Sequence, residues 1–239
     1  MPLGAARLNT LAKFQAPAGP VRTQYTITPV NDTQVDTAQY QFGGASALFD
    51  GTGDYMQVAD GSTYDLFAFG TNDWTIEMWI RPAVSGTVRY LLDARNAAGS
   101  VAVAIVWQLR NDNKLYAYAN GSFWATSSGT ISANTWTHIA LVRDGDALRQ
   151  YINGTEDGGR TGIALANFID NQGLFGTYHA KTAAFWNGHM DEIRISDTAR
   201  YSGSSFTVPT SAFTNDSDTR FLMHANGTDG STTFIDDAF

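Results

Sequence analysis

The segment 134–154, NTWTHIALVRDGDALRQYING, has the period of two that is typical of β-strands. One face of its first half holds Trp136, His138, Ala140 and Val142, and the other holds Thr137, Ile139, Leu141 and Arg143. The short connection 144–146, Asp-Gly-Asp, separates two β-rich runs and predicts an antiparallel hairpin. Because both faces hold bulky apolar groups, we expect a strand covered on both sides, with Trp136 bridging two sheets.

A second clear alternation is the run 74–81, WTIEMWIR. Its inward face holds Trp74, Ile76, Met78 and Ile80, and its opposite face holds Glu77, Trp79 and Arg81. A hairpin is expected over 46–58, turning at 50–53, and Pro29 indicates that 25–30 is an edge strand.

Shorter runs with turn signals every eight to twelve residues complete the predicted fold. They are Arg89–Asp93, Val101–Leu109, Lys114–Ala119, Ser122–Ser127, Leu174–Gly176, Ala183–Trp186, Met190–Ile195, Thr219–His224 and Thr232–Ile235, with a turn at Asn187-Gly188. With little helix among them, these runs predict an all-β sandwich. We expect one domain over 21–239 that includes the C-terminal strand segment.

Residues 1–20 are expected to form a short N-terminal arm. Its large apolar residues, Leu3, Leu8, Leu11 and Phe14, have a loosely helical spacing, and the run 16–20, APAGP, breaks any regular element. One interpretation is a loosely docked terminus. The other is an apolar arm that anchors in a partner subunit, because four exposed large hydrophobes would otherwise be a liability. In the second interpretation, these four residues are assembly contacts of a homo-oligomer.

Composition narrows the classes of partner. The chain has 239 residues, a formal net charge of −8 and no cysteine. An acidic chain without a basic run is a poor candidate for binding nucleic acid or anionic membrane. No apolar run approaches the roughly 18–20 residues of a membrane span. The start also lacks the apolar core of a signal peptide, so we expect the chain to stay where it is made, or to leave by assembly or lysis.

Catalytic motifs are missing from the sequence. There is no Gly-x-Ser-x-Gly hydrolase motif and no Glu-x-Asp-x-x-Glu glycosidase signature in the chain. The closest carboxylate pair is Asp191 and Glu192, but neighbours on a strand point to opposite faces and so cannot share one sugar. We therefore expect no catalytic residue and no enzyme activity.

Metal sites are not indicated by spacing either. The four histidines show no metal-ligand spacing, so no metal ligand is predicted. No cofactor is required, but calcium stays open because it takes oxygen ligands from scattered loops. The candidate donors are Asp112, Asp144, Asp146 and Asp170, each of which is also an ordinary turn residue.

Sugar recognition needs exposed aromatic faces beside polar side chains. The candidate ligand-binding residues are Trp124, Tyr178, His179, Trp186 and Asn187. The alternative for the tryptophans is that they fill the sandwich, which we favour for Trp186. Tyr178 and His179 lie among glycine and polar residues, so they are the better surface candidates.

Five motifs occur in an order that is similar to that of a known family. SALFDGTGDYMQV, WTIEMWIRP, NTWTHIALVRDG, LRQYINGT and WNGHMDEIRIS together resemble the laminin-G-like and pentraxin-like group of concanavalin A-like jelly rolls. The resemblance covers about 42–196. It implies a two-sheet antiparallel jelly-roll sandwich, with one sheet concave, and a binding or structural module more often than an enzyme.

A second resemblance concerns the two ends of the domain. Arg200-Tyr201 and the segment 206–239 resemble a segment of tailed-phage virion proteins, where it commonly precedes a stretch similar to 26–55. Here the two stretches lie at opposite ends. Their contiguity in the relatives predicts that Thr219–His224 lies antiparallel to, or one strand away from, Tyr25–Val30.

The second resemblance implies a non-enzymatic structural component of a phage virion, such as a decoration, tail or fibre protein. Such a protein would be made in the host cytoplasm and would contact other virion proteins, with host-surface glycans as further partners. The alternatives are a carbohydrate-binding lectin-like module and, less favoured, a glycoside hydrolase.

Overall fold

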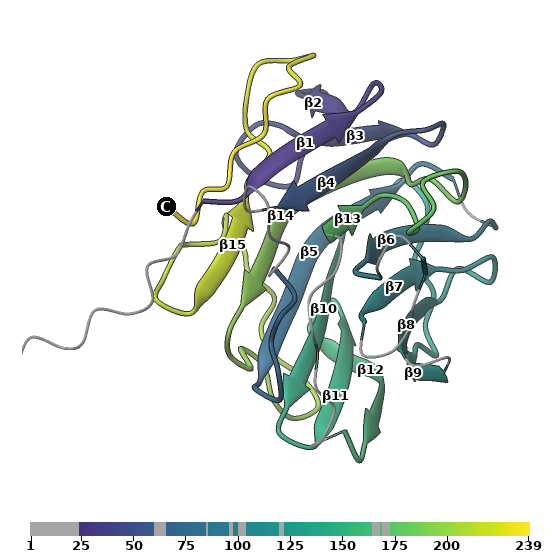
Figure 1. Ribbon diagram of the computed structural model, residues 1–239, viewed down its shortest axis with the longest axis vertical. Coiled ribbons are helices and arrows are strands. Elements are labelled where there is room, and N and C mark those ends of the chain that lie inside the picture. The colour runs from purple at the N-terminus through teal and green to yellow at the C-terminus, as the bar shows by residue number, and fades with distance from the viewer. Residues whose placement is uncertain are drawn as a thin grey trace, which may run out of the picture.

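The computed structural model describes residues 24–59, 66–84, 86–95, 98–99, 104–119, 122–163, 168 and 173–239. Within these ranges the chain is all β, and two antiparallel sheets lie face to face (Figure 1). The predicted two-sheet sandwich is therefore confirmed. Leu3, Leu8, Leu11 and Phe14, and with them the predicted arm, lie outside the described residues.

The first sheet, sheet A, has seven strands. In spatial order they are β1 (Thr26–Val30), β4 (Tyr55–Ala59), β13 (Gly173–Phe175), β6 (Arg89–Asp93), β7 (Val106–Leu109), β8 (Leu115–Ala119) and β9 (Ser122–Thr126). Pro29 lies in β1 at one edge, where its missing N–H leaves no ladder bond unmade.

The second sheet, sheet B, has eight strands. In spatial order they are β12 (Thr155–Thr161), β11 (Ala147–Ile152), β10 (Thr137–Asp144), β5 (Trp74–Pro82), β14 (Asn187–Ser196), β3 (Ser46–Asp50) and β2 (Gln34–Asp36), and β15 (Thr219–Met223) also pairs with β14. The hairpin predicted within 134–154 is the β10–β11 pair, with Asp144 opposite Ala147 at its turn.

The main core lies between the two sheets. The inward face predicted for β5, with Trp74, Ile76, Met78 and Ile80, belongs to this core. Ile139 and Leu141 of β10 join it, whereas Ala140 and Val142 pack on the other side, against Tyr201 and Phe206. The expectation that β10 is covered on both sides is confirmed.

Trp136 does not bridge the sheets. It is half-buried just before β10 and packs with Phe42, Trp79 and Phe213 on the outer face of sheet B. The period-two pattern groups residues by face but does not say which face meets the other sheet.

The hairpin expected over 46–58 is wrong. β3 and β4 belong to different sheets, so the connection 51–54 carries the chain across the sandwich. Asp54 fixes this crossing, because its carboxylate accepts the N–H groups of Asp50 at 2.9 Å and Asp32 at 3.0 Å. Sequence alternation identifies the two strands but contains nothing about their partners.

Three shorter predictions also need correction. Asn187-Gly188 is no turn but begins β14, and neither 183–186 nor 232–235 forms a strand. Of the run 101–109, β7 takes Val106–Leu109, and 101–103 lie outside the described residues.

The two ends of the domain meet through a carboxylate rather than by strand pairing. β1 belongs to sheet A and β15 to sheet B, so the predicted neighbourhood within one sheet is wrong. Instead, Asp236 accepts the N–H of Tyr25 at 3.1 Å and the N–H of Leu222 at 3.2 Å. Figure 1 shows the resulting position of the yellow C-terminal segment beside β1 and β2.

Candidate functional site

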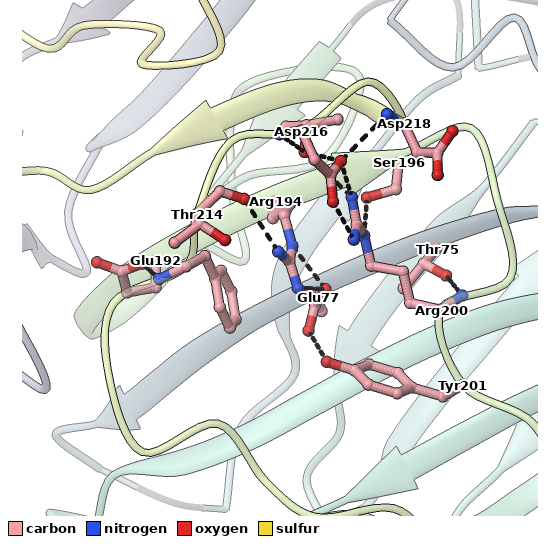
Figure 2. Close-up of polar contacts among 12 residues, drawn as sticks. Thr75, Glu77, Glu192, Arg194, Ser196, Arg200, Tyr201, Thr214, Asp216 and Asp218 are labelled. Atoms are coloured by element: carbon pink, nitrogen blue, oxygen red, sulfur yellow. Dashed lines mark hydrogen bonds and ion pairs between the residues drawn. The ribbon is translucent and has the colours of Figure 1, made fainter.

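The outer face of sheet B is covered by the segment 197–218, and a buried carboxylate holds it there (Figure 2). Glu77 of β5 is fully buried. Its carboxylate accepts Nε of Arg194 at 2.9 Å and the hydroxyl of Tyr201 at 2.7 Å, and Nε2 of His138 lies 3.1 Å away. Burial opposes the charge of Glu77, but the contacts with His138 and Arg194 outweigh it and lower its pKa.

A second ion pair, between Arg200 and Asp216, joins two residues of the same segment. Figure 2 shows the guanidinium of Arg200 facing the carboxylate of Asp216, with two hydrogen bonds of 2.7 and 2.9 Å. The backbone N–H of Arg200 donates to Thr75 of β5 at 2.9 Å. The Arg200 bonds hold the pKa of Asp216 well below its usual range. These contacts fasten the segment to the sheet, so this face is occupied by the chain itself.

Asp191 and Glu192 are also covered on the outer face of sheet B, Asp191 by 41–42 and Glu192 by Phe213. The expectation that they point to opposite faces is wrong, because Glu192 has a φ of 53° and the register with β5 shifts between Asp191 and Arg194. Asp191 accepts the N–H groups of Gln41 and Phe42, and Glu192 accepts that of Phe213. Both carboxyl groups are fully buried, so the pair does not offer the accessible acid and base that a glycosidase needs.

The outer face of sheet A holds a row of tyrosines. Tyr90 of β6 lies opposite Gln108 of β7, and Gln108 lies opposite Tyr116 of β8. Cross-strand partners in an antiparallel sheet share one face. Because Trp107 and Ala117, next in sequence to Gln108 and Tyr116, are in the core, this row faces away from it.

The connection between β13 and β14 lies against this row. The ring centroid of Tyr178 is 5.7 Å from that of Tyr90. The N–H of His179 donates to Asp93 at 2.9 Å, and Nζ of Lys181 donates to Gln57 of β4 at 2.9 Å. We call this surface the tyrosine face; its tyrosines are Tyr55, Tyr90, Tyr116, Tyr118 and Tyr178, all half-buried.

A fixed polar pair lies within the tyrosine face. Asp93 is fully buried and accepts Nε of Arg95 at 3.0 Å on both carboxylate oxygens. The Arg95 guanidinium lies 5.7 Å from the centre of the Tyr90 ring. Hydrogen bonds that fix both groups preorganise polar atoms beside an aromatic ring, the combination found in small-ligand sites.

The predicted ligand-binding residues divide between surface and core. Tyr178 and His179 are half-buried on the tyrosine face. Trp186 and Trp124 are buried in the core between the sheets, so their assignment as ligand-binding residues is wrong. Their size makes burial in the sandwich more favourable than exposure. Asn187 begins β14 in sheet B, where its side chain lies against Gly51, away from the tyrosine face.

Sequence analysis missed Tyr90, Arg95 and Lys181. The alternation of Tyr116 and Tyr118 with Leu115 and Ala117 already indicates one aromatic face. Tyr90 and Lys181 join it only through strand pairing and loop packing, which no local pattern specifies.

Two of the candidate calcium donors have other partners. Asp112 accepts the hydroxyl of Tyr116 at 2.9 Å, and Asp144 lies 3.6 Å from Arg149. Asp170 lies outside the described residues. Across the part of the chain that the structure describes, no group of three or more His, Cys, Asp or Glu side chains could hold a metal ion.

A different hollow lies on sheet B, over β11 and β12. It has a volume of about 620 Å³ and includes Arg149, Glu156, Gly159, Arg160 and Ser204 in its lining. Its lining contains no aromatic ring, which distinguishes it from the tyrosine face. Separately, the described ranges contain no helix of the length and apolar character that a membrane span requires.

Comparison with solved structures gives the same fold at low identity. A candidate carbohydrate-binding protein from Bacteroides ovatus ATCC 8483 has a TM-score of 0.51 and 12% identity, covering 87% of this chain and 81% of that one. The binding domain of Paraclostridial Mosquitocidal Protein 1 has a TM-score of 0.54 and 16% identity, covering 74% and 45%. Tailspike protein 2 of Escherichia coli O157:H7 bacteriophage CAB120 has a TM-score of 0.53 and 11% identity, covering 76% and 27%.

The family comparison is more specific. Among curated proteins no match was found. A family model described as the concanavalin A-like lectin/glucanases superfamily matches residues 50–203, which is more than half of the chain. Together with the two-sheet sandwich, this match shows that the chain belongs to the concanavalin A-like lectin/glucanase superfamily.

Proposed function

We propose that this chain is a non-enzymatic carbohydrate-binding module and that glycan binds on the tyrosine face. The observation on which this rests is the pairing of the half-buried rings of Tyr90 and Tyr178 beside the fixed Asp93–Arg95 pair. Sugars present apolar C–H faces ringed by hydroxyls. A tyrosine ring with a polar tip, next to a guanidinium that the buried Asp93 carboxylate holds in place, matches both properties.

Two further observations support this surface. Much of the outer face of sheet B is covered by 197–218, whereas the five tyrosines of the tyrosine face are all half-buried. A Bacteroides ovatus protein of the same fold, over 87% of this chain, is a candidate carbohydrate-binding protein. The first supports the place of binding and the second the class of ligand.

Replacement of Tyr178 by Ala is expected to abolish most of the glycan affinity. The wild-type chain is first screened on a glycan array, and the best ligand is then titrated by calorimetry. Loss of a central aromatic contact costs about 2 kcal/mol or more, which is roughly a 30-fold weaker Kd. Because the Tyr178 ring is half-exposed, we expect the melting temperature to change little.

Tyr40→Ala is the matched control for this measurement. Tyr40 is 49% exposed and lies between β2 and β3 of sheet B, so its removal should leave the affinity unchanged. Absence of any glycan binding by the wild type would refute the proposal. Equal affinity of Tyr178→Ala and wild type would refute this site.

A structural role in a phage virion is the second candidate. It is supported by the resemblance of 206–239 to a segment of virion proteins and by the shared fold with a phage tailspike. The two functions are compatible, because a glycan-binding module in a virion would bind host-surface sugars. In this role Leu3, Leu8, Leu11 and Phe14 would anchor the chain in a neighbouring subunit. Mass spectrometry of purified virions checks whether the protein is a virion component.

A further inference from the structure

Basic side chains accompany the tyrosines of the tyrosine face. The guanidinium of Arg95 lies 5.7 Å from the Tyr90 ring centre, and that of Arg110 lies 5.0 Å from the Tyr116 ring centre. The ammonium of Lys181 lies 5.9 Å from the Tyr55 ring centre. Three cations next to tyrosine rings on one face contrast with the net charge of −8 of the whole chain.

Two of these cations have a carboxylate close by. Arg95 is paired with Asp93, which is fully buried. Near Arg110, Asp112 accepts the hydroxyl of the same Tyr116 ring at 2.9 Å. The charge of Arg95 is therefore balanced within the protein, and Asp112 brings a negative charge to the Tyr116 ring that Arg110 contacts.

Lys181 differs from both arginines. Its ammonium donates one hydrogen bond to the neutral amide oxygen of Gln57 at 2.9 Å, and among the described residues no carboxylate forms an ion pair with it. An ammonium has three N–H donors. A half-buried cation beside a neutral partner retains its attraction for an external anion.

The backbone at Lys181 adds an independent observation. Its φ is 58°, in the left-handed region where glycine or asparagine is favoured over a long side chain. Its N–H closes a turn onto the carbonyl of Tyr178 at 2.9 Å. A lysine at such a position has a conformational cost, so its presence points to a role for the ammonium, which lies beside Tyr55, on the same face as Tyr178.

We infer that the tyrosine face selects an anionic glycan, with Tyr178 against the sugar ring and Lys181 binding an anionic group on it. This inference rests on the proposed function and specifies its ligand class. The shared chemistry is an anionic oxygen group on a sugar, which a uronic acid, a sialic acid or a sulfated sugar would supply.

The test compares anionic glycans with neutral matches by calorimetry at 50 and 500 mM NaCl. The probes are tetragalacturonate and its methyl ester, a sialic acid oligomer and its methyl ester, and a sulfated oligosaccharide with its desulfated form. Wild type is expected to bind at least one anionic member at least about 10-fold more tightly than its neutral match at low salt. The preference should shrink at high salt because charge attraction is screened.

Lys181→Met keeps the apolar stem and removes the charge, so the preference for the anionic member should fall to near parity while neutral binding persists. Lys181→Arg, which keeps the positive charge, should retain the preference for the anionic member. Arg160→Met, which removes one positive charge from the exposed part of β12, should leave it unchanged.

A wild type that binds neutral and anionic members equally would overturn this inference and leave the carbohydrate-binding proposal standing. If Lys181→Met binds the anionic member with the same preference as wild type, the inference is likewise overturned and the carbohydrate-binding proposal stands. A wild type that binds no glycan would overturn both.

Discussion

Replacing Glu77 with Gln is expected to lower the free energy of unfolding by about 3–5 kcal/mol, the usual cost of breaking a buried ion pair. Glu77 is fully buried, and its carboxylate balances Arg194, which lies 2.7 Å away. The substitution keeps the side-chain volume but leaves the buried guanidinium without its counter-charge. Urea denaturation measures the change.

Glu156→Gln is the matched control. Glu156 pairs with Arg149 at 3.0 Å, but both side chains are 27% exposed. Half-exposed pairs contribute less than about 1 kcal/mol, so this variant should be close to wild type. Because Tyr201 donates to Glu77, Glu77→Gln should also expose 197–218 to limited proteolysis. Equal losses in the two variants would contradict a special role for the buried network.

Asp191→Asn is expected to remove a large part of the pH dependence of stability. Burial raises the pKa of Asp191 from an ordinary value of 3.8 to about 7. Between these pH values the folded chain holds a proton that the unfolded chain releases, so the free energy of unfolding falls as the pH rises. A shift of this size corresponds to about 4 kcal/mol. The Asn variant, which does not titrate, should gain about that much relative to wild type from pH 4 to pH 8.

Other groups near Asp191 also titrate in this range. The hydrogen bond to Glu192 raises the pKa of His224, so its contribution likewise falls with rising pH. Burial lowers the pKa of His189, which works in the opposite direction. Both histidines remain in the variant, so the difference between the two unfolding curves reports Asp191 together with its charge coupling to His224. A difference that does not change from pH 4 to pH 8 would show that Asp191 is ionised throughout.

The sequence patterns predict the strands better than their partners. The alternation in 74–81 assigns the inward face of β5 correctly, because the core requires a continuous apolar side. Alternation of this kind in 46–58 does not reveal that β3 and β4 belong to different sheets. It also gives no hint that Glu77 is buried, because the Tyr201 and Arg194 that contact it lie more than a hundred residues away.

The candidate site was predictable only in part. Tyr178 and His179 lie in a polar, glycine-flanked stretch, and local composition was enough to place them at the surface. Trp124 and Trp186 have the residue type of a sugar platform but belong to the core, since composition does not reveal burial. Lys181 becomes a candidate only when its contact with Gln57 and its positive φ are known.

Mapping the bound glycan by backbone amide chemical shifts tests the central claim most directly. Nitrogen-15-labelled protein is titrated with the glycan selected on the array. The largest shifts are expected at Tyr90, Gln108, Tyr116 and 178–181, because these residues share the tyrosine face. Shifts concentrated instead in the hollow over β11 and β12, or along 197–218, would contradict the assignment of the ligand-binding surface to sheet A.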